Sequence, residues 1–157
     1  MVYRIFQAYL DDENSITIEL EKSFDAYSIH FTLEDKHSSS PLTIKKIENQ
    51  EHQIIYTLSA NDPIDLTESY TVYDQDRNHT ILQYRHIVQK PIFDELFSYQ
   101  GRDLGASYSP QATDFKLWAP ISEKVLLHLE EQIIPLQRQD RGVWHTQILG
   151  DLEGKAY

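Results

Sequence analysis

The chain has 157 residues, a formal net charge of −11 and no cysteine. This length, with a hydrophobic content of 40%, suits one ordinary domain or two small ones. The acidity is spread along the chain, which argues against nucleic acid and anionic membranes as partners because both need clustered Lys and Arg. The lack of cysteine excludes disulfides and thiolate metal sites. The composition is compatible with neutral partners such as sugars.

The first 90 residues have the pattern of short β-strands separated by turns. Hydrophobic residues alternate with polar ones at 16–20, 27–33, 54–58, 70–72 and 82–88. Clusters of turn-forming residues lie between these stretches, for example D-D-E-N-S, H-S-S-S-P and D-Q-D-R-N. Short strands with regular turns predict an all-β sandwich.

The pattern changes near residue 90. The stretch P-I-F-D-E-L-F-S-Y at 91–99 predicts one or two turns of helix, because it begins with proline and has acidic residues in its first turn. An ordered connector with two glycines and a proline follows. We therefore expect a first β domain at 1–90, a connector at 91–110 and a second β domain at 111–157.

Strands resume in the second domain, at 113–119, 124–129, 133–136 and 143–149. They contain the two tryptophans of the chain, Trp118 and Trp144. A tryptophan here can fill the core of a small sandwich or offer a flat face to a sugar ring, and filling the core is the favoured interpretation. The candidate carbohydrate contacts are Trp118, Trp144, Tyr70 and Tyr73.

No pattern of catalytic or metal-binding residues stands out. Asp74, Asp76 and Asn78 have the spacing of the start of a calcium loop, but His79 and Arg85 occupy the positions that need glycine and glutamate, so a plain hairpin turn is predicted. The seven histidines have no ligand spacing. Adjacent acidic residues point to opposite faces of a strand or to water. We expect no catalytic residue, no metal and no cofactor.

Several motifs in order resemble one known family. They are F-D-E-L-F-S-Y-Q-G-R-D-L-G-A-S-Y, T-D-F-K-L-W-A-P, G-V-W and G-D-L-E-G-K-A-Y, all within residues 93–157. Together they resemble the N-terminal region of type I pullulanases, which are starch-debranching enzymes of the α-amylase family, glycoside hydrolase family 13. Gln100 departs from the pattern, where the family usually has Asp. The stretch F-Q-A-Y-L-D-D-E-N at 6–14 is similar to the start of the same enzymes.

The resemblance implies a fold for each part of the chain. It implies that residues 1–90 form the small β domain that begins these enzymes. Residues 93–157 would belong to a family 48 carbohydrate-binding module, an immunoglobulin-like sandwich that is incomplete here at its C-terminal end. Such a sandwich would have an unpaired strand edge, so we expect a frayed C-terminus or self-association through that edge.

The resemblance also implies a role. The whole enzymes carry a catalytic (β/α)₈ barrel that cleaves α-1,6 branches of glucans, and its catalytic carboxylates lie downstream of this region. We expect a non-catalytic segment that docks on or orients the barrel in cis and is inactive alone. The candidate docking residues are Phe93, Phe97, Tyr99 and Tyr108, and the alternative for them is packing between the two β domains. A second hypothesis is an autonomous module that binds an α-glucan such as starch, glycogen or pullulan.

The expected location is the cytoplasm. The N-terminus, M-V-Y-R-I-F-Q-A-Y-L-D-D-E, has charges on both sides of a short apolar stretch and does not match a signal peptide. No apolar run approaches the roughly 20 residues of a membrane span.

Overall fold

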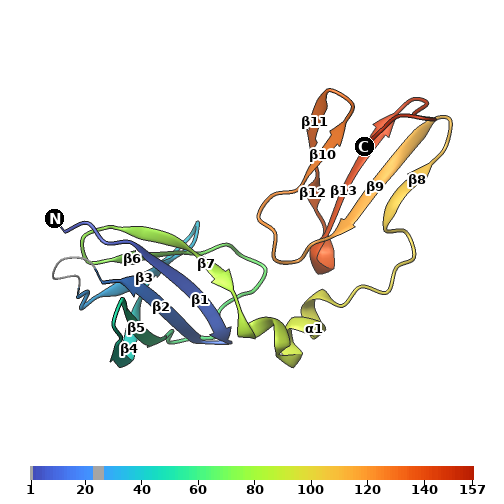
Figure 1. Ribbon diagram of the computed structural model, residues 1–157. Helices are drawn as coiled ribbons and strands as arrows, with labels where there is room; N and C mark the ends of the chain where they lie inside the picture. The colour runs from blue at the N-terminus through green and yellow to red at the C-terminus, as the bar shows by residue number, and fades with distance from the viewer. Residues whose placement is uncertain (1, 23–26) are drawn as a thin grey trace. The chain divides into compact units, whose positions relative to one another are not determined.

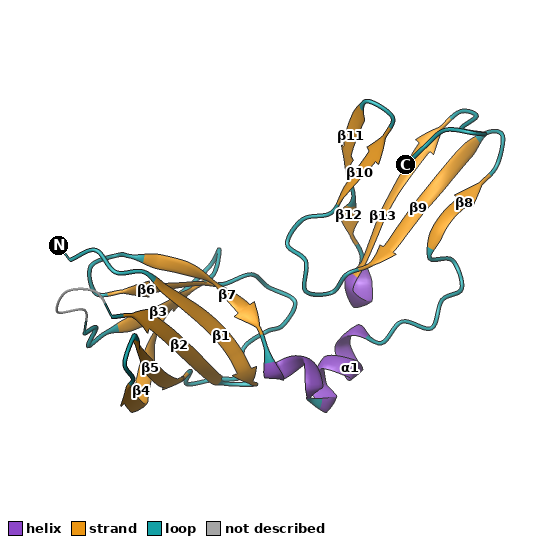
Figure 2. Ribbon diagram, viewed as in Figure 1, coloured by secondary structure: helices purple, strands orange, loops and turns teal. Residues whose placement is uncertain are grey.

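The computed structural model describes residues 2–22 and 27–157, and the chain divides into two compact units, Met1–Lys90 and Pro91–Tyr157 (Figure 1). Strands dominate both units, which confirms the predicted all-β class (Figure 2). Within the described ranges, no helix is long and apolar enough to cross a membrane.

The first unit is a closed barrel of seven strands in the order β1-β2-β5-β4-β3-β6-β7. Neighbours pair antiparallel, except that β1 and β7 close the barrel as a parallel pair. The strands are β1 (Phe6–Asp12), β2 (Ser15–Glu21), β3 (Phe31–Glu34), β4 (Ser39–Asn49), β5 (Gln53–Ser59), β6 (Thr71–Asp74) and β7 (His79–Tyr84).

The long strand β4 explains why this unit is a barrel, where the alternation of the sequence suggested two stacked sheets. Its first residues pair with β3 and its later residues pair with β5. The pairing with β5 shifts between Ile44 and Lys46, as at a β-bulge, and bulges bend strands. One strand therefore belongs to both halves of the sheet, and the sheet closes on itself.

The barrel interior is filled by every second residue of its strands. The ring of Phe31 lies at its centre, with edge-to-face contacts to Phe6 at 5.8 Å and to Tyr56 at 5.1 Å between ring centroids. The Tyr56 hydroxyl accepts a hydrogen bond from the backbone N–H of Ser28 at 3.0 Å, so its polar end is satisfied inside the barrel. The other fully buried large side chains include Leu10, Ile16, Ile18, Leu20, Ile54, Leu58 and Val72.

A buried ion pair ties the N-terminal segment to the hairpin of β6 and β7. The Arg4 guanidinium donates to Asp74 at 3.0 Å and to Asp76 at 2.7 Å, and the Asp74 side chain is fully buried. Asp74 also accepts the backbone N–H groups of Asp76 and Asn78. The predicted hairpin is confirmed, and its acidic residues bind an arginine and the turn's own backbone.

Two predicted strands of the first unit are shorter than the sequence suggested. The strand predicted at 82–88 ends at Tyr84, and a 3₁₀ helix, η1 (His86–Gln89), follows it. The strand predicted at 27–33 begins only at Phe31.

The second unit begins with the predicted helix, α1 (Pro91–Phe97), and continues as two antiparallel sheets. One sheet has the order β12-β13-β9-β8, and the other is the hairpin β10-β11. Part of the predicted connector, 91–110, is a strand of the larger sheet. The remaining elements are β8 (Gly105–Tyr108), β9 (Ala112–Trp118), β10 (Leu126–Leu129), β11 (Gln132–Pro135), β12 (Gln137–Arg138), the 3₁₀ helix η2 (Asp140–Gly142) and β13 (Val143–Leu149).

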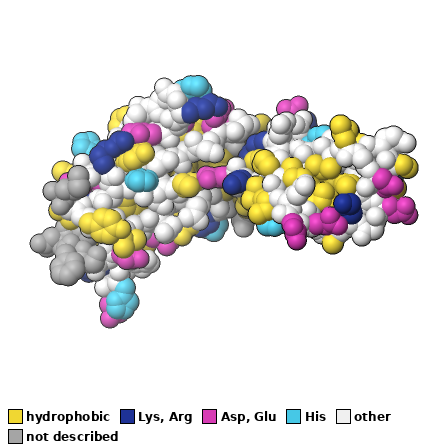
Figure 3. All heavy atoms as spheres, turned by 90° about the horizontal axis from the view of Figure 1, so that it is seen from above, with side chains coloured by type: hydrophobic (Ala, Val, Ile, Leu, Met, Phe, Trp, Pro, Cys, Tyr) yellow, Lys and Arg dark blue, Asp and Glu magenta, His cyan; other side chains and the backbone are white. Residues whose placement is uncertain are grey.

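The core of the second unit is smaller than that of the barrel. It consists of Phe115, Leu127, Leu129, Leu136 and Trp144, from both sheets. Many hydrophobic side chains of this unit reach the surface instead, as Figure 3 shows. An apolar groove of about 200 Å³ runs beside Phe115 and includes the exposed side chains of Leu117, Leu126 and Tyr157.

A polar pocket in the second unit as candidate functional site

The outer face of the larger sheet is polar because of strand alternation. Phe115 of β9 points to the core, so Asp114 and Lys116 on either side of it point outward. On β13, His145 lies opposite Lys116 and Gln147 lies opposite Asp114. Cross-strand partners share a face, so the four polar side chains lie side by side.

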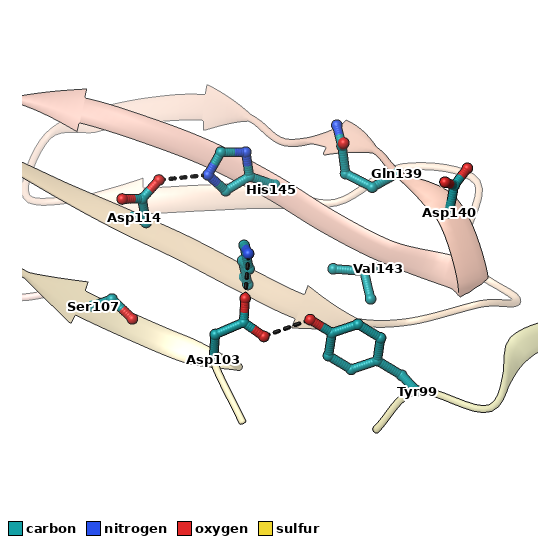
Figure 4. A pocket seen from close by; sticks show the side chains of 9 residues that line it. Tyr99, Asp103, Ser107, Asp114, Gln139, Asp140, Val143 and His145 are labelled. Carbon is teal, nitrogen blue, oxygen red and sulfur yellow. Dashed lines mark hydrogen bonds and ion pairs between the residues drawn. The ribbon is translucent and has the colours of Figure 1, made fainter. Parts of the chain in front are cut away.

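A pocket of about 600 Å³ opens on this face (Figure 4). The segment between α1 and β8 supplies one wall, with Tyr99 and Asp103, and the turn before β13 supplies another, with Gln139 and Asp140. The full lining consists of Tyr99, Asp103, Ser107, Asp114, Lys116, Gln139, Asp140, Val143 and His145.

Asp103 is the best-connected carboxylate in the pocket. It accepts hydrogen bonds from the Lys116 ammonium and from the Tyr99 hydroxyl. The bond from Lys116, followed by that from Tyr99, lowers the pKa of Asp103 from its ordinary value of 3.8 to about 2. The same bonds raise the pKa of Lys116 and of Tyr99. This wall is therefore charged and internally paired at neutral pH.

A second carboxylate is paired across the strands. The Nε2 atom of His145 lies 2.7 Å from Oδ1 of Asp114, and the Gln147 amide donates to both carboxylate oxygens of Asp114 at 3.3 Å. The bond from His145, and then those from Gln147, lower the pKa of Asp114. The floor of the pocket thus presents side chains whose positions are fixed by one another.

These side chains can exchange hydrogen bonds with hydroxyl groups or with the polar groups of a protein surface. A metal is not suggested by their arrangement. In the part of the chain that the structure describes, no group of three or more His, Asp or Glu side chains could hold a metal ion.

The two tryptophans have different environments. Trp144 is 6% exposed, packs in the core and donates its indole N–H to the Ala119 carbonyl at 3.0 Å. Its burial leaves no ring face for a ligand, so the structure removes it from the candidate carbohydrate contacts. Trp118 is 41% exposed, and its indole N–H donates to the carbonyls of Phe97 at 2.8 Å and Arg141 at 3.1 Å.

The two candidate tyrosines, Tyr70 and Tyr73, belong to the first unit and are half-buried. The Arg77 guanidinium lies 3.8 Å from the centre of the Tyr73 ring, and the His79 ring lies 5.2 Å from it. These neighbours occupy much of the Tyr73 ring face. The four carbohydrate candidates are therefore divided between the two units.

The four candidate docking residues fall into two pairs. Phe93 and Phe97 are buried, with ring centroids 4.8 Å apart. Tyr99 forms a wall of the pocket. Tyr108 is exposed and donates its hydroxyl to Asp151 at 2.8 Å, which raises the pKa of Tyr108.

The chain belongs to the family described as the pullulanase N1-terminal domain, whose model matches residues 6–89. A second family model, described as carbohydrate-binding module 48 (isoamylase N-terminal domain), matches residues 103–157. The two matches fall on the two compact units of the structure.

Relatives and solved structures agree with these matches. The pullulanase of Bacillus subtilis (strain 168) is 28% identical over 99% of this chain and 22% of its own length, and its structure with maltose has a TM-score of 0.83. The structure of a pullulanase from Anoxybacillus sp. LM18-11 with maltotriose is 33% identical, has a TM-score of 0.82 and covers 95% of this chain and 22% of that one. The chloroplastic pullulanase 1 of Arabidopsis thaliana is 30% identical over 81% of this chain. The chain thus spans 22% or less of the curated relatives it matches.

Proposed function

We propose that this chain is the non-catalytic N-terminal part of a pullulanase-like, α-1,6-glucan debranching glycoside hydrolase and that it docks on or orients a catalytic (β/α)₈ barrel in cis. One observation carries the proposal. The chain aligns over 95–99% of its length with pullulanases, and the alignment occupies only 22% of theirs. The region it resembles is therefore a minor part of each relative, and most of each relative lies outside the matched part.

The surface of the second unit supports a docking role. Large hydrophobic side chains are exposed there, including Leu149 at 78% and Ile133 at 60%. Contiguous exposed apolar surface marks contact sites in soluble proteins, and the apolar groove beside Phe115, with the exposed side chains of Leu117, Leu126 and Tyr157, is such a surface. The partner we infer is a catalytic (β/α)₈ barrel in the same polypeptide, because the relatives have the matched region as part of one longer chain.

A chimera tests the proposal. The matched 22% of the Bacillus subtilis pullulanase would be replaced by this chain, and the chimera compared with the enzyme from which that part is deleted. We expect the chimera to melt at a higher temperature and to retain more activity on pullulan. A chimera carrying Leu117→Asp and Leu126→Asp, which places charges in the apolar groove, is the matched control and should behave like the deletion. Equal melting of the chimera and the deletion would overturn the docking role.

The second candidate function is autonomous binding of an α-glucan. The family match over residues 103–157 favours it, as does the polar pocket, whose paired carboxylates and amides suit sugar hydroxyls. Trp118 is the exposed tryptophan of this unit and lies on the same outer face as Lys116. If a glucan binds, we expect contacts at this face rather than at Trp144.

Three finer points complete the proposal. The second unit would be an immunoglobulin-like sandwich in which further strands complete the smaller sheet. The chain would act in the cytoplasm, a reducing compartment with which a sequence without cysteine is compatible. The free edge of β10, which pairs within the described residues only with β11, could support self-association in the isolated chain.

A further inference from the structure

The C-terminal end of α1 is held by two side chains from distant parts of the second unit. The last carbonyls of a helix lack partners within the helix and need outside donors. Trp118 donates its indole N–H to the Phe97 carbonyl at 2.8 Å. Arg141 donates to the carbonyls of Ser98 at 3.1 Å and Glu95 at 3.4 Å. These two side chains, here called the α1 clamp, donate hydrogen bonds to the carbonyls at the end of the helix.

The position of Arg141 is built into an unusual turn. Arg141 has φ 56° and the next residue, Gly142, has φ 73°, so both lie in the left-handed region. A Cβ atom on Gly142 would lie 2.5 Å from the Cα atom of Pro120, so only glycine fits there. The Gly142 carbonyl accepts the Ala119 N–H at 2.9 Å, which joins this turn to the end of β9, where Trp118 lies.

The two members of the clamp are also joined to each other. The Trp118 indole N–H lies 3.1 Å from the Arg141 carbonyl as well as 2.8 Å from the Phe97 carbonyl. This explains why Trp118 sits at a half-exposed position: its polar edge is engaged although its ring is not in the core. Neither core packing nor sugar stacking accounts for that arrangement.

We propose that Trp118 and Arg141 are positioning residues, which fix α1 to the second unit and thereby place Tyr99 and Asp103 as one wall of the polar pocket. Tyr99 follows Phe97 by only two residues. When the end of the helix is fixed, the position of Tyr99 in the pocket wall is therefore restricted as well. Asp103 then reaches Lys116 of β9, the same strand that carries Trp118. Trp118 and Lys116 thus hold the two ends of the 98–103 segment on β9, and Arg141 holds the first end from η2.

The test uses the 157-residue chain and the variants Trp118→Phe and Arg141→Asn. Asparagine tolerates the left-handed backbone of Arg141 but removes the guanidinium. We expect hydrogen exchange of the Ser98 amide, which donates to Asp94 at 2.9 Å, to become about five- to tenfold faster in each variant, as for the loss of one hydrogen bond. We also expect the titration midpoint of Asp103, followed by carboxyl-carbon NMR, to rise.

Arg138→Asn is the matched control. Arg138 also donates to carbonyls, those of Pro120 at 2.6 Å and Ser122 at 3.0 Å, but neither carbonyl belongs to α1 or to the 98–103 segment. This variant should change neither the Ser98 exchange rate nor the Asp103 midpoint. Arg141→Lys, which keeps a cationic donor, should recover part of both.

Two results would overturn the proposal. One is an unchanged Ser98 rate and Asp103 midpoint in the double variant Trp118→Phe/Arg141→Asn. The other is an equal change in Arg138→Asn, which would mean a general loosening of the unit. A variant is folded if the amide signals of β9 and β13 stay dispersed. If the double variant loses this dispersion, the Ser98 exchange rate and the Asp103 midpoint of the single variant Arg141→Asn test the proposal instead.

Discussion

The two units of this chain differ in where one ion pair of each unit lies. In the closed barrel, the Arg4–Asp74 pair is buried, with side-chain exposures of 3% and 0%. In the open second unit, the Asp103–Lys116 pair lies at the surface and lines a pocket. Breaking a buried pair leaves an uncompensated charge in a poorly solvated place, whereas water screens an exposed pair. The Arg4–Asp74 pair therefore ties the N-terminal segment into the interior of the first unit, whereas the Asp103–Lys116 pair lines a surface pocket.

The two units also differ in the size of their buried cores. Among the described residues of the first unit, the seven strands close into a barrel without a free edge, and many of the barrel's large side chains are fully buried. The second unit has two separate sheets and a core cluster of five buried residues, with Leu149, Ile133 and Leu117 exposed. A closed unit followed in the sequence by a more open one suits a segment whose second half contacts a partner. Three predictions follow from this difference.

The largest effect is expected from Arg4→Met. It would leave the Asp74 carboxylate buried without its cation and cost the barrel about 3–5 kcal/mol of unfolding free energy. Urea unfolding followed by amide signals of the first unit measures this. Arg77→Met is the control, because the Arg77–Glu34 pair is exposed and its loss should leave the unfolding free energy nearly unchanged. Equal effects of the two variants would contradict the contrast drawn between buried and exposed charge.

A smaller loss, confined to the second unit, is expected from Gly142→Ala. The new methyl group would meet Pro120 and the backbone would remain at φ 73°, which together cost about 2–4 kcal/mol. Gly150→Ala separates the two causes, because Gly150 also has a positive φ, of 100°, but has open space around it. Unfolding monitored by signals of β9 and β13 should show the larger loss for Gly142→Ala. A loss that extends to the barrel would show that the units unfold together.

The smallest effect concerns the exposed pair of the pocket. The pKa of Asp103 is lower in the folded chain, about 2, than its ordinary value of 3.8, so the pair's contribution to stability is present above pH 3.8 and is lost as the pH falls towards 2. Lys116→Met should raise the midpoint of Asp103 because it removes the main cause of the shift. Carboxyl-carbon NMR measures the midpoint. A midpoint that stays near 2 in this variant would assign the shift to Tyr99 instead.

The sequence predicts much of this architecture through alternation. The strands at 16–20, 54–58, 113–119 and 143–149 are found where expected, since each has one hydrophobic face. The strand β1 is missing from the strands that the sequence predicts, although Phe6, Ala8 and Leu10 alternate with polar residues. The strand β4 gives no alternation, because nearly all of its side chains are exposed.

Barrel closure and the pocket depend on contacts that a pattern along the chain does not contain. The parallel pairing of β1 and β7 joins segments more than 70 residues apart. The pocket needs the register of β9 on β13, which sets His145 beside Asp114, and a fold of the connector that brings Asp103 to Lys116. The sequence shows a polar residue on each side of Phe115, but it does not show which residues lie opposite these two on the neighbouring strand.

One titration tests most directly whether this segment acts through protein contacts. Two-dimensional amide NMR spectra of the chain would be recorded with increasing maltotetraose or β-cyclodextrin, up to millimolar concentration. The account predicts a dispersed spectrum without saturable shifts, which leaves docking on the catalytic (β/α)₈ barrel as the role of the segment. Saturable shifts clustered around Trp118, Lys116 and His145 would contradict it and establish an autonomous glucan-binding module.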